Sequence, residues 1–277
     1  MAASHVEHDG DWLCWGVPST DELVVPESEL GEEPEDLVVW GGPASTRQPV
    51  TWEMHHHRAD EILIPLSGTV AARSGEHVWN LSPGLGIWIP ARCRHSVRIA
   101  ANSRFLTVYV AAGIGPRLGA RPVTVQGTAL LTELMLHLSS REMSSEARSR
   151  AEAVLLDLLE PAGERGRIAI PSAGPAARIA QALLRSPDDQ RTVADWAREI
   201  GVGTSTLGRQ FREDTGVSFG RWRTLLRMNV AMSLIGQGCA VAEVAERVGY
   251  SSPSSFVAVF RKATGLTPTA FRKATDR

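Results

Sequence analysis

An internal repeat near the C-terminal end constrains this 277-residue chain more than any other feature. The octapeptide at Phe211 returns 49 residues later at Phe260, and both copies fit F-R-x-x-T-G-[VL]-[ST]. Upstream of each copy stands the pattern Ala-x-x-x-Gly, which begins at Ala197 and at Ala245. A small alanine lets a second helix cross closely, and glycine suits the turn between two helices. The repeat therefore predicts two helix-turn-helix motifs, joined by a longer amphipathic stretch over 221–235.

The second helix of each predicted motif has an apolar side and a polar side. Ser252 is a good N-cap in the second copy, and proline follows it at the first helical position. In a helix-turn-helix motif the polar side of this second helix would enter the major groove of DNA. Arg209 is then the best candidate for bidentate contact with the edge of a guanine, and the serines suit base edges or phosphates. The positions predicted to face DNA are Thr204, Ser205, Gly208, Arg209 and Arg212 in the first motif, and Ser252, Ser254, Val257, Ala258 and Arg261 in the second.

Charge is divided unevenly along the chain. Residues 191–277 contain 13 Lys and Arg against 7 Asp and Glu, whereas residues 1–190 contain 16 against 24. A basic C-terminal part behind an acidic remainder is typical of a nucleic-acid-binding domain attached to a sensing or assembly domain. No apolar run approaches the roughly 18 residues of a membrane-spanning helix, and the N-terminus lacks the plan of a secretory signal. These features predict a cytoplasmic protein that associates with the nucleoid when bound to DNA.

The repeat closely resembles the DNA-binding domain of the AraC/XylS family of transcription regulators. The resemblance covers about the last hundred residues, and it implies a domain that places two recognition helices in successive major-groove segments beside a promoter. Gly208 departs from a strong recognition helix, since glycine costs a helix roughly 0.5–1 kcal/mol relative to alanine. The residues that carry the resemblance are Ala197, Gly201, Leu207, Phe211, Gly216, Ala245, Gly249, Tyr250, Ser251, Phe256, Phe260, Gly265 and Pro268.

The N-terminal half has the sequence pattern of a β domain. Short runs rich in β-branched and aromatic residues are separated by Gly, Pro, Ser or Asn, at the spacing expected of a sandwich or barrel. A helical pattern follows them and is interrupted by a polar turn at 139–145, which predicts a helical hairpin. The predicted strands are 38–40, 50–55, 61–66, 69–72, 77–81, 86–90, 95–99 and 105–110.

Two spaced motifs in this β region resemble those of cupins. The first is His55-x-His57-x3-Glu61-x6-Gly68, and the second is Gly84-x5-Pro90-x4-His95, with arginine at 92 and 98 where glycine and asparagine are usual. The resemblance implies that His55, His57, Glu61 and His95 occupy the four metal-binding positions of enzymatic cupins. Three imidazoles and a carboxylate suit Zn, Ni, Fe or Mn.

Alternatives to a metal site remain open at this point. In many cupin-type regulators the barrel binds a small organic effector instead. Arg92 and Arg98 are candidates to receive a carboxylate or phosphate of such an effector, with Trp88 beside them, or else they lie on the outer face. Three widely separated cysteines imply neither a disulfide framework nor a CxxC site.

The sequence thus predicts a multidomain α+β protein: a cupin-like β-barrel (jelly roll) with a helical hairpin, then an all-α double helix-turn-helix domain. Its predicted function is transcription regulation through promoter DNA, as a homodimer that senses a small molecule or metal ion and contacts RNA polymerase if it is an activator. The alternatives are a metal-dependent cupin enzyme with a DNA-binding tail, and a constitutive DNA-binding dimer with an inert barrel. The predicted units are an acidic arm (1–36), the sensor domain (37–122), the hairpin for dimerisation (123–160), a linker (161–174) and the DNA-binding domain (175–277).

Overall fold

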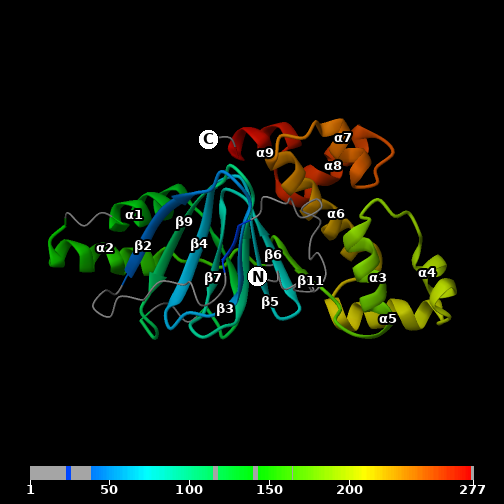
Figure 1. The fold of residues 1–277 in the computed structure, drawn as a ribbon, viewed down its shortest axis with the longest axis horizontal. Helices are drawn as coiled ribbons and strands as arrows, with labels where there is room; N and C mark the ends of the chain where they lie inside the picture. Colours follow the sequence, from blue (N-terminus) through cyan, green and yellow to red (C-terminus); the bar gives the residue numbers. More distant parts are fainter. Residues whose placement is uncertain (1–22, 26–38, 115–117, 140–142, 164, 276–277) are drawn as a thin grey trace, which may run out of the picture.

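The computed structural model describes residues 23–25, 39–114, 118–139, 143–163 and 165–275. Figure 1 shows a β domain in the middle of the molecule, a pair of helices on one flank, and the remaining helices on the other flank. None of the helices in these ranges is long and apolar enough to cross a membrane.

The described strands form two separate sheets and not a closed barrel, which refines the barrel prediction. The eight predicted strands correspond to β2–β9, whereas three short strands at sheet edges were not predicted. One of them, β1, lies in the arm expected to be irregular and pairs in parallel with β3; the rest of the arm is outside the described residues. The six-stranded sheet has the order β1 (Leu23–Val25), β3 (Val50–His55), β8 (His95–Ile99), β5 (Val70–Ser74), β6 (His77–Leu81) and β11 (Arg167–Ala169); the five-stranded sheet has the order β10 (Val123–Gln126), β7 (Leu85–Ile89), β4 (Asp60–Ser67), β9 (Arg104–Val110) and β2 (Val39–Ser45).

Strand alternation divides the apolar residues of this domain between two cores. On β7, Ile87 and Ile89 belong to the core between the sheets, while Trp88 belongs to the core between the five-stranded sheet and the helical pair. That pair is α1 (Ala129–Ser139) and α2 (Ser145–Asp157), and Ser144 is the N-cap of α2. Successive side chains point to opposite faces of a strand, so each sheet supplies apolar groups to both sides.

Seven helices follow β11 and contain the predicted repeat. The turn glycines of both motifs have positive φ angles, +79° at Gly201 and +77° at Gly249, as expected from their position between two helices. Leu207, Phe211, Phe256 and Phe260 are fully buried, as their alignment predicted. The helices are α3 (Gly174–Arg185), α4 (Val193–Ile200), α5 (Thr204–Thr215), α6 (Phe219–Gly236), α7 (Val241–Arg247), α8 (Pro253–Thr264) and α9 (Pro268–Thr275).

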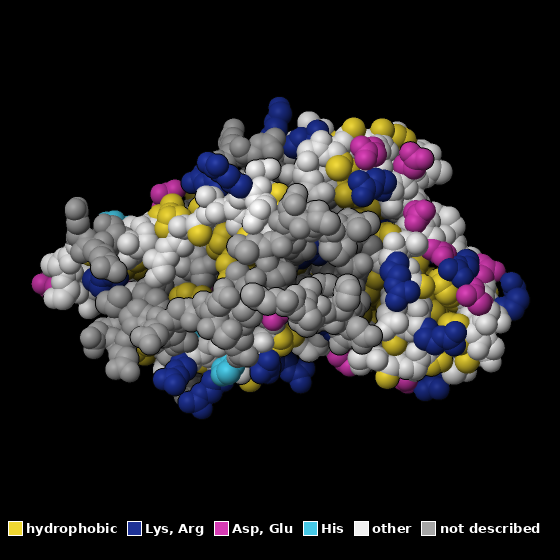
Figure 2. Space-filling view, in the orientation of Figure 1, with side chains coloured by type: hydrophobic (Ala, Val, Ile, Leu, Met, Phe, Trp, Pro, Cys, Tyr) yellow, Lys and Arg dark blue, Asp and Glu magenta, His cyan; other side chains and the backbone are white. Residues whose placement is uncertain are grey.

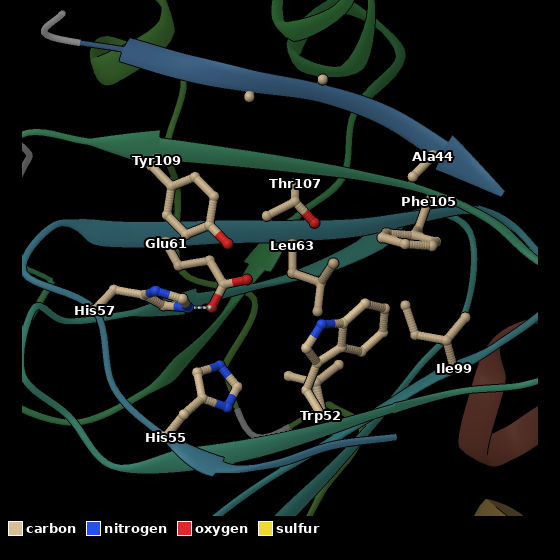
Figure 3. A pocket seen from close by; sticks show the side chains of 13 residues that line it. Ala44, Trp52, His55, His57, Glu61, Leu63, Ile99, Phe105, Thr107 and Tyr109 are labelled. Carbon is tan, nitrogen blue, oxygen red and sulfur yellow. Dashed lines mark ion pairs between the residues drawn. The ribbon is translucent and has the colours of Figure 1, made fainter. Parts of the chain in front are cut away.

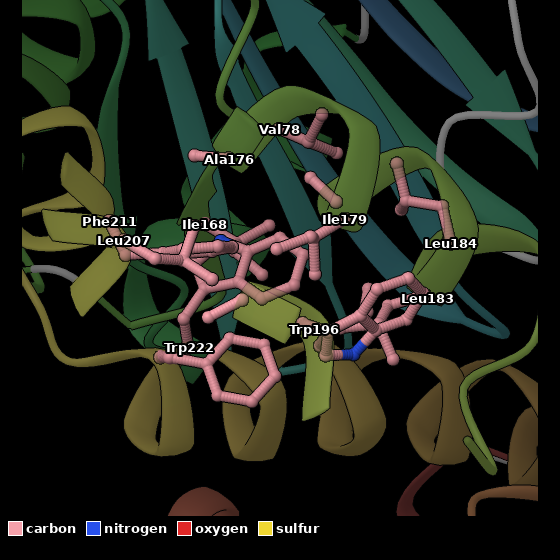
Figure 4. Packing of buried hydrophobic residues seen from close by; sticks show 14 of the residues in the cluster. Val78, Ile168, Ala176, Ile179, Leu183, Leu184, Trp196, Leu207, Phe211 and Trp222 are labelled. Carbon is pink, nitrogen blue, oxygen red and sulfur yellow. The ribbon is translucent and has the colours of Figure 1, made fainter. Parts of the chain in front are cut away.

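The first helix-turn-helix motif packs on the outer face of the six-stranded sheet. One continuous apolar cluster includes Val78 of β6, Ile168 of β11, Phe211 of α5 and Trp222 of α6 (Figure 4). The Trp222 indole Nε1 also donates a hydrogen bond of 2.6 Å to the carbonyl oxygen of Ala169. Since β11 lies in the segment predicted as a linker, this linker is a structured part of the contact between the two domains.

Candidate functional site

His55, His57 and Glu61 line one end of a cavity between the two sheets (Figure 3), and His95 lies directly beside Glu61. His55 and His95 are register partners on β3 and β8 of the six-stranded sheet, while Glu61 comes from β4 of the other sheet. His57 lies just beyond the end of β3, and its ring centroid is 4.9 Å from that of His55. The structure therefore brings the four predicted metal-binding residues together from three segments.

A register shift in β3 explains how His55 and His57 reach this cavity. Strict alternation from Trp52, which lines the same cavity, would turn His56 inward and its two histidine neighbours outward. The pairing of β3 with β8 is irregular between Trp52 and His55, and such an irregularity moves later residues to the other face. His55 is buried and His56 is exposed as a result.

Backbone carbonyls orient two of the histidines. His55 Nδ1 donates to the carbonyl oxygen of Glu53 at 2.5 Å, and His95 Nδ1 donates to that of Cys93 at 2.9 Å. Each bond leaves Nε2 as the nitrogen available to bind a metal, an arrangement common among histidines that bind metals. One ligand nitrogen from each of His55, His57 and His95 lies within 4.8 Å of the others.

Glu61 supplies a buried negative charge to the same cluster. Its Oε2 lies 3.1 Å from His95 Nε2 and 3.8 Å from His57 Nε2. Burial alone would raise the pKa of the Glu61 carboxyl, but the neighbouring histidines, His95 above all, lower it below its usual value. Burial lowers the pKa of His55 to about 4, so this imidazole is neutral and able to bind a metal at neutral pH.

Beyond His55, His57 and Glu61 the cavity is mostly apolar. Its volume is about 220 Å³, and its lining continues along the strands with Trp52, Leu63, Val97, Ile99 and Phe105. Thr107 and Tyr109 add two hydroxyl groups near Glu61 (Figure 3). Sequence reasoning missed most of these residues, although the alternation of Phe105, Thr107 and Tyr109 on one face of β9 is a signal that could have found them.

The residues predicted for an organic effector lie elsewhere. Arg98 is on β8 between Val97 and Ile99, and because those two residues line the cavity, Arg98 points to the opposite face. Trp88 is buried under the helical pair, and Arg92 is in the turn before β8. Arg92 has a φ of +62°, which explains why glycine is usual at this position, and its backbone N–H donates to the carbonyl oxygen of His57. None of the three lines the cavity, so the prediction of an effector pocket at these residues is wrong, and Arg98 fits the outer-face alternative.

The predicted DNA-facing positions lie at the surface of α5 and α8. Eight of them are exposed and two, Gly208 and Val257, are half-buried; none is fully buried. The Ser252 side chain caps α8 as predicted, since it accepts a hydrogen bond from the backbone N–H of Ser255. Figure 2 shows the Lys and Arg side chains spread among acidic ones on the visible face of the helical domain, so net charge alone does not mark one patch.

A groove on the first motif joins these positions to two helix N-termini. Ser205, Gly208, Arg209 and Arg212 of α5 line it together with residues at the starts of α4 and α6. The N-cap hydroxyls of Thr192 and Ser218 bind the first turns of those helices, and helix N-termini attract phosphate groups. Sequence reasoning missed both caps, although Thr192 and Asp195 form a capping box that the spacing could have shown.

Two protein families match this chain. Residues 41–159 match the AraC-like ligand binding domain, and residues 196–274 match a helix-turn-helix domain. The regulator NimR of Escherichia coli is 27% identical over 227 residues, which are 79% of this chain and 81% of NimR. The regulator RipA of Corynebacterium glutamicum is 31% identical over 210 residues, which are 74% of this chain and 59% of RipA.

Solved structures also align with the chain. ToxT from Vibrio cholerae has a TM-score of 0.38 and 10% identity, over 87% of this chain and 98% of ToxT. A DNA-binding transcriptional dual regulator from Escherichia coli has a TM-score of 0.35 and 30% identity, over 38% of this chain and 96% of its own.

The two matched domains stand in the order predicted from the two sets of motifs, and they are separated by the β11 segment. The similar proteins found are named as transcriptional regulators and not as enzymes, so the cupin-enzyme alternative receives no support. This chain belongs to the AraC family of DNA-binding transcriptional regulators, with a ligand-binding domain followed by a helix-turn-helix domain.

Proposed function

We propose that this regulator holds a divalent transition metal ion on His55, His57, His95 and Glu61, and that the ion is the polar end of its effector site. The observation that carries the proposal is the convergence of these four side chains. The ligand nitrogens of the three histidines lie within 4.8 Å of one another, and Glu61 Oε2 lies 3.1 Å from His95 Nε2. A bound ion offers a positively charged centre for a ligand that donates an oxygen or nitrogen. Zn, Ni, Fe and Mn all suit this mixed donor set.

The rest of the cavity selects the remainder of the effector. No arginine or lysine lines the cavity within the part of the chain that is described. The metal, the histidines and the hydroxyl groups of Thr107 and Tyr109 are therefore the groups that would receive a polar or anionic end, while Trp52 and Phe105 contact an apolar body. This supports a small amphipathic effector, most simply one with an aromatic or branched apolar part.

β8 is the element through which the site acts on DNA binding in this proposal. Its residues Val97 and Ile99 line the cavity and His95 contacts Glu61, while Ala100 just after it belongs to the cluster that contains Trp222 of α6. An effector controls DNA binding only if it has different affinities for two arrangements of the domains. Movement of β8 would change the surface on which the first helix-turn-helix motif packs. The regulator acts in the cytoplasm, where promoter DNA and RNA polymerase are available.

DNA binding with and without metal tests this function. We expect specific binding to the region upstream of the protein's own gene, with a dissociation constant that changes by more than about threefold when chelated protein is reloaded with metal. Fluorescence anisotropy at fixed ionic strength measures it, since phosphate contacts make the affinity depend steeply on salt. Equal affinity in both states would show that the metal alone does not control DNA binding.

The helical pair is proposed as a homodimer interface. Leu130 of α1 and Val154 of α2 are 61% and 47% exposed, although both are large apolar residues. We expect Leu130→Asp to weaken self-association by at least about tenfold, since an interface of this kind depends on a few buried apolar side chains. Sedimentation equilibrium measures it. Leu266→Asp, at an exposed leucine of the helical domain, is the control and should associate like the wild type; a monomeric wild type contradicts the proposal.

A further inference from the structure

The two helix-turn-helix motifs have separate hydrophobic cores, and one helix passes through both. Phe219, Trp222 and Leu226 of α6 belong to the first core, while the residues from Met228 to Ile235 contribute to the second. Arg227 stands at the boundary between the two sets. A helix shared by two otherwise separate cores does not by itself fix their relative orientation, because helices bend.

Arg227 ties the first motif to the second across this boundary. Its side chain is 7% exposed and donates hydrogen bonds to three backbone carbonyl oxygens. Nε donates to Pro187 at 2.7 Å and Nη2 to Asp189 at 2.9 Å, both in the loop before α4. Nη1 donates to Gly249 at 3.3 Å, in the turn of the second motif. The fixed fork of a guanidinium joins these acceptors only when both motifs hold one relative position.

A second side chain repeats the same connection. Gln190, in the loop before α4, donates from Nε2 to the carbonyl oxygen of Asp188 at 2.9 Å and to that of Gly249 at 2.8 Å. We call Arg227, Gln190 and Gly249 the clasp. Because a buried donor without an acceptor costs free energy, separation of the two motifs would leave the guanidinium unsatisfied.

Comparison of the two turn glycines shows that the clasp is built into one copy of the repeat alone. A Cβ at Gly201, in the first turn, would meet no atom within 4 Å. A Cβ at Gly249 would lie 2.7 Å from Arg227 Nη2, 2.7 Å from Gln190 Nε2 and 2.8 Å from Asp188 Cα. Both glycines have similar positive φ angles, so the backbone demand is the same. Gly249 is therefore required for a second reason, because a side chain at this position would clash with residues of the clasp and of the loop before α4.

We propose that the clasp is a positioning device that sets the distance and rotation between the two recognition helices on DNA, and so the spacing of the two DNA segments that the regulator accepts. Neither Arg227 nor Gly249 needs to touch DNA for this role. The inference rests on the proposed binding of this regulator to promoter DNA, with both motifs on one duplex as the sequence predicts, and it adds the residues that determine the spacing.

The test compares operators of altered spacing. A DNA site selected from a random-sequence library with full-length wild-type protein is footprinted, and one base pair is then inserted between the two protected segments. The insertion rotates one segment by about 35° relative to the other. We expect the wild type to lose at least about tenfold in affinity, and Arg227→Met to lose less than about threefold while binding the original site more weakly. Affinity for DNA that contains the first segment alone should be the same for both proteins.

The glycine pair provides the matched control. Gly201→Ala and Gly249→Ala introduce the same backbone strain at a positive φ, but only Gly249→Ala also displaces the clasp. Gly249→Ala should therefore bind the operator with the inserted base pair almost as well as the original one, whereas Gly201→Ala should keep the loss of affinity seen in the wild type. Should Arg227→Met fail to fold in a thermal melt, Gln190→Ala removes one bond of the clasp from a more exposed side chain and takes its place. A spacing penalty unchanged in Arg227→Met and Gly249→Ala overturns the role of the clasp. Protection of a single segment by the wild type overturns the binding of DNA by both motifs as well.

Discussion

Replacement of both His55 and His57 by alanine is expected to lower the metal content of the purified protein from about one ion per chain to near zero. Loss of partners that merely orient a metal ligand already costs about 10- to 100-fold in affinity, and two direct ligands should cost more than that. The protein is purified without chelator and analysed by inductively coupled plasma mass spectrometry. The same protein should lose the change in DNA affinity that metal produces in the wild type.

His56→Ala is the matched control for this experiment. His56 lies between the two replaced residues but is exposed, because the irregularity in β3 turns its neighbours inward. The control should keep full metal content and the metal response. A wild type without metal after reloading, or an equal loss in His56→Ala, contradicts the proposed site and leaves the cavity to an organic ligand alone.

Metal affinity should also fall as the pH is lowered, since protons compete for the same ligands. His95 is the sensitive ligand: burial lowers its pKa, but the adjacent Glu61 carboxylate outweighs burial and raises the pKa above its usual value. His55, with a pKa of about 4, is protonated only at much lower pH. Metal titrations between pH 5 and 8 are expected to show the loss begin near or above the usual histidine pKa of about 6.5.

The clustering of His55, His57, Glu61 and His95 was predictable from their spacing, while the apolar part of the cavity was not. His55, His57, Glu61 and His95 stand in two short motifs, so their approach depends on few strands. The failures at Arg98 and Trp88 have another cause. The two-residue period that places Val97 and Ile99 inside places Arg98 outside. The same period places Ile87 and Ile89 between the sheets and Trp88 under the helical pair. The same period, applied to β9, would have indicated Phe105, Thr107 and Tyr109.

The edges of the fold were the least predictable part. Strands β1, β10 and β11 have three or four residues each, too few to show a period, and they exist because a neighbouring strand offers an edge. β11 shows that such an edge strand can take part in the contact between the two domains. Its segment contains glycine and proline and was predicted as a linker, yet it pairs with β6 and accepts the hydrogen bond from Trp222. Contacts of this kind, between residues 53 positions apart, leave no local pattern in a single sequence.

Arg209→Ala is expected to weaken binding to the selected DNA site by about 5- to 150-fold, or about 1–3 kcal/mol, and to relax the preference at one base pair. Arg209 Nη1 lies 3.0 Å from Glu213 Oε1, and both side chains are more than half exposed. An exposed pair of this kind contributes little to stability, so the guanidinium is able to exchange its carboxylate for a guanine edge. Competition binding with all four base pairs at each position of the first segment measures the preference.

Two further variants separate this readout from general electrostatics. Arg150→Ala removes an exposed arginine that also pairs with a glutamate four residues away, with Nη1 2.6 Å from Glu146 Oε1, but on α2 of the helical pair; it should leave the preference among base pairs unchanged. Glu213→Gln removes the competing carboxylate and should raise affinity by a few-fold. If Arg209 contacts phosphate instead of a base, Arg209→Ala weakens all sequences about equally and reduces the salt dependence by about one ion. In that case the sequence-specific contact would be made by Ser205 or by another residue of α5, because Gly208 has no side chain with which to make it.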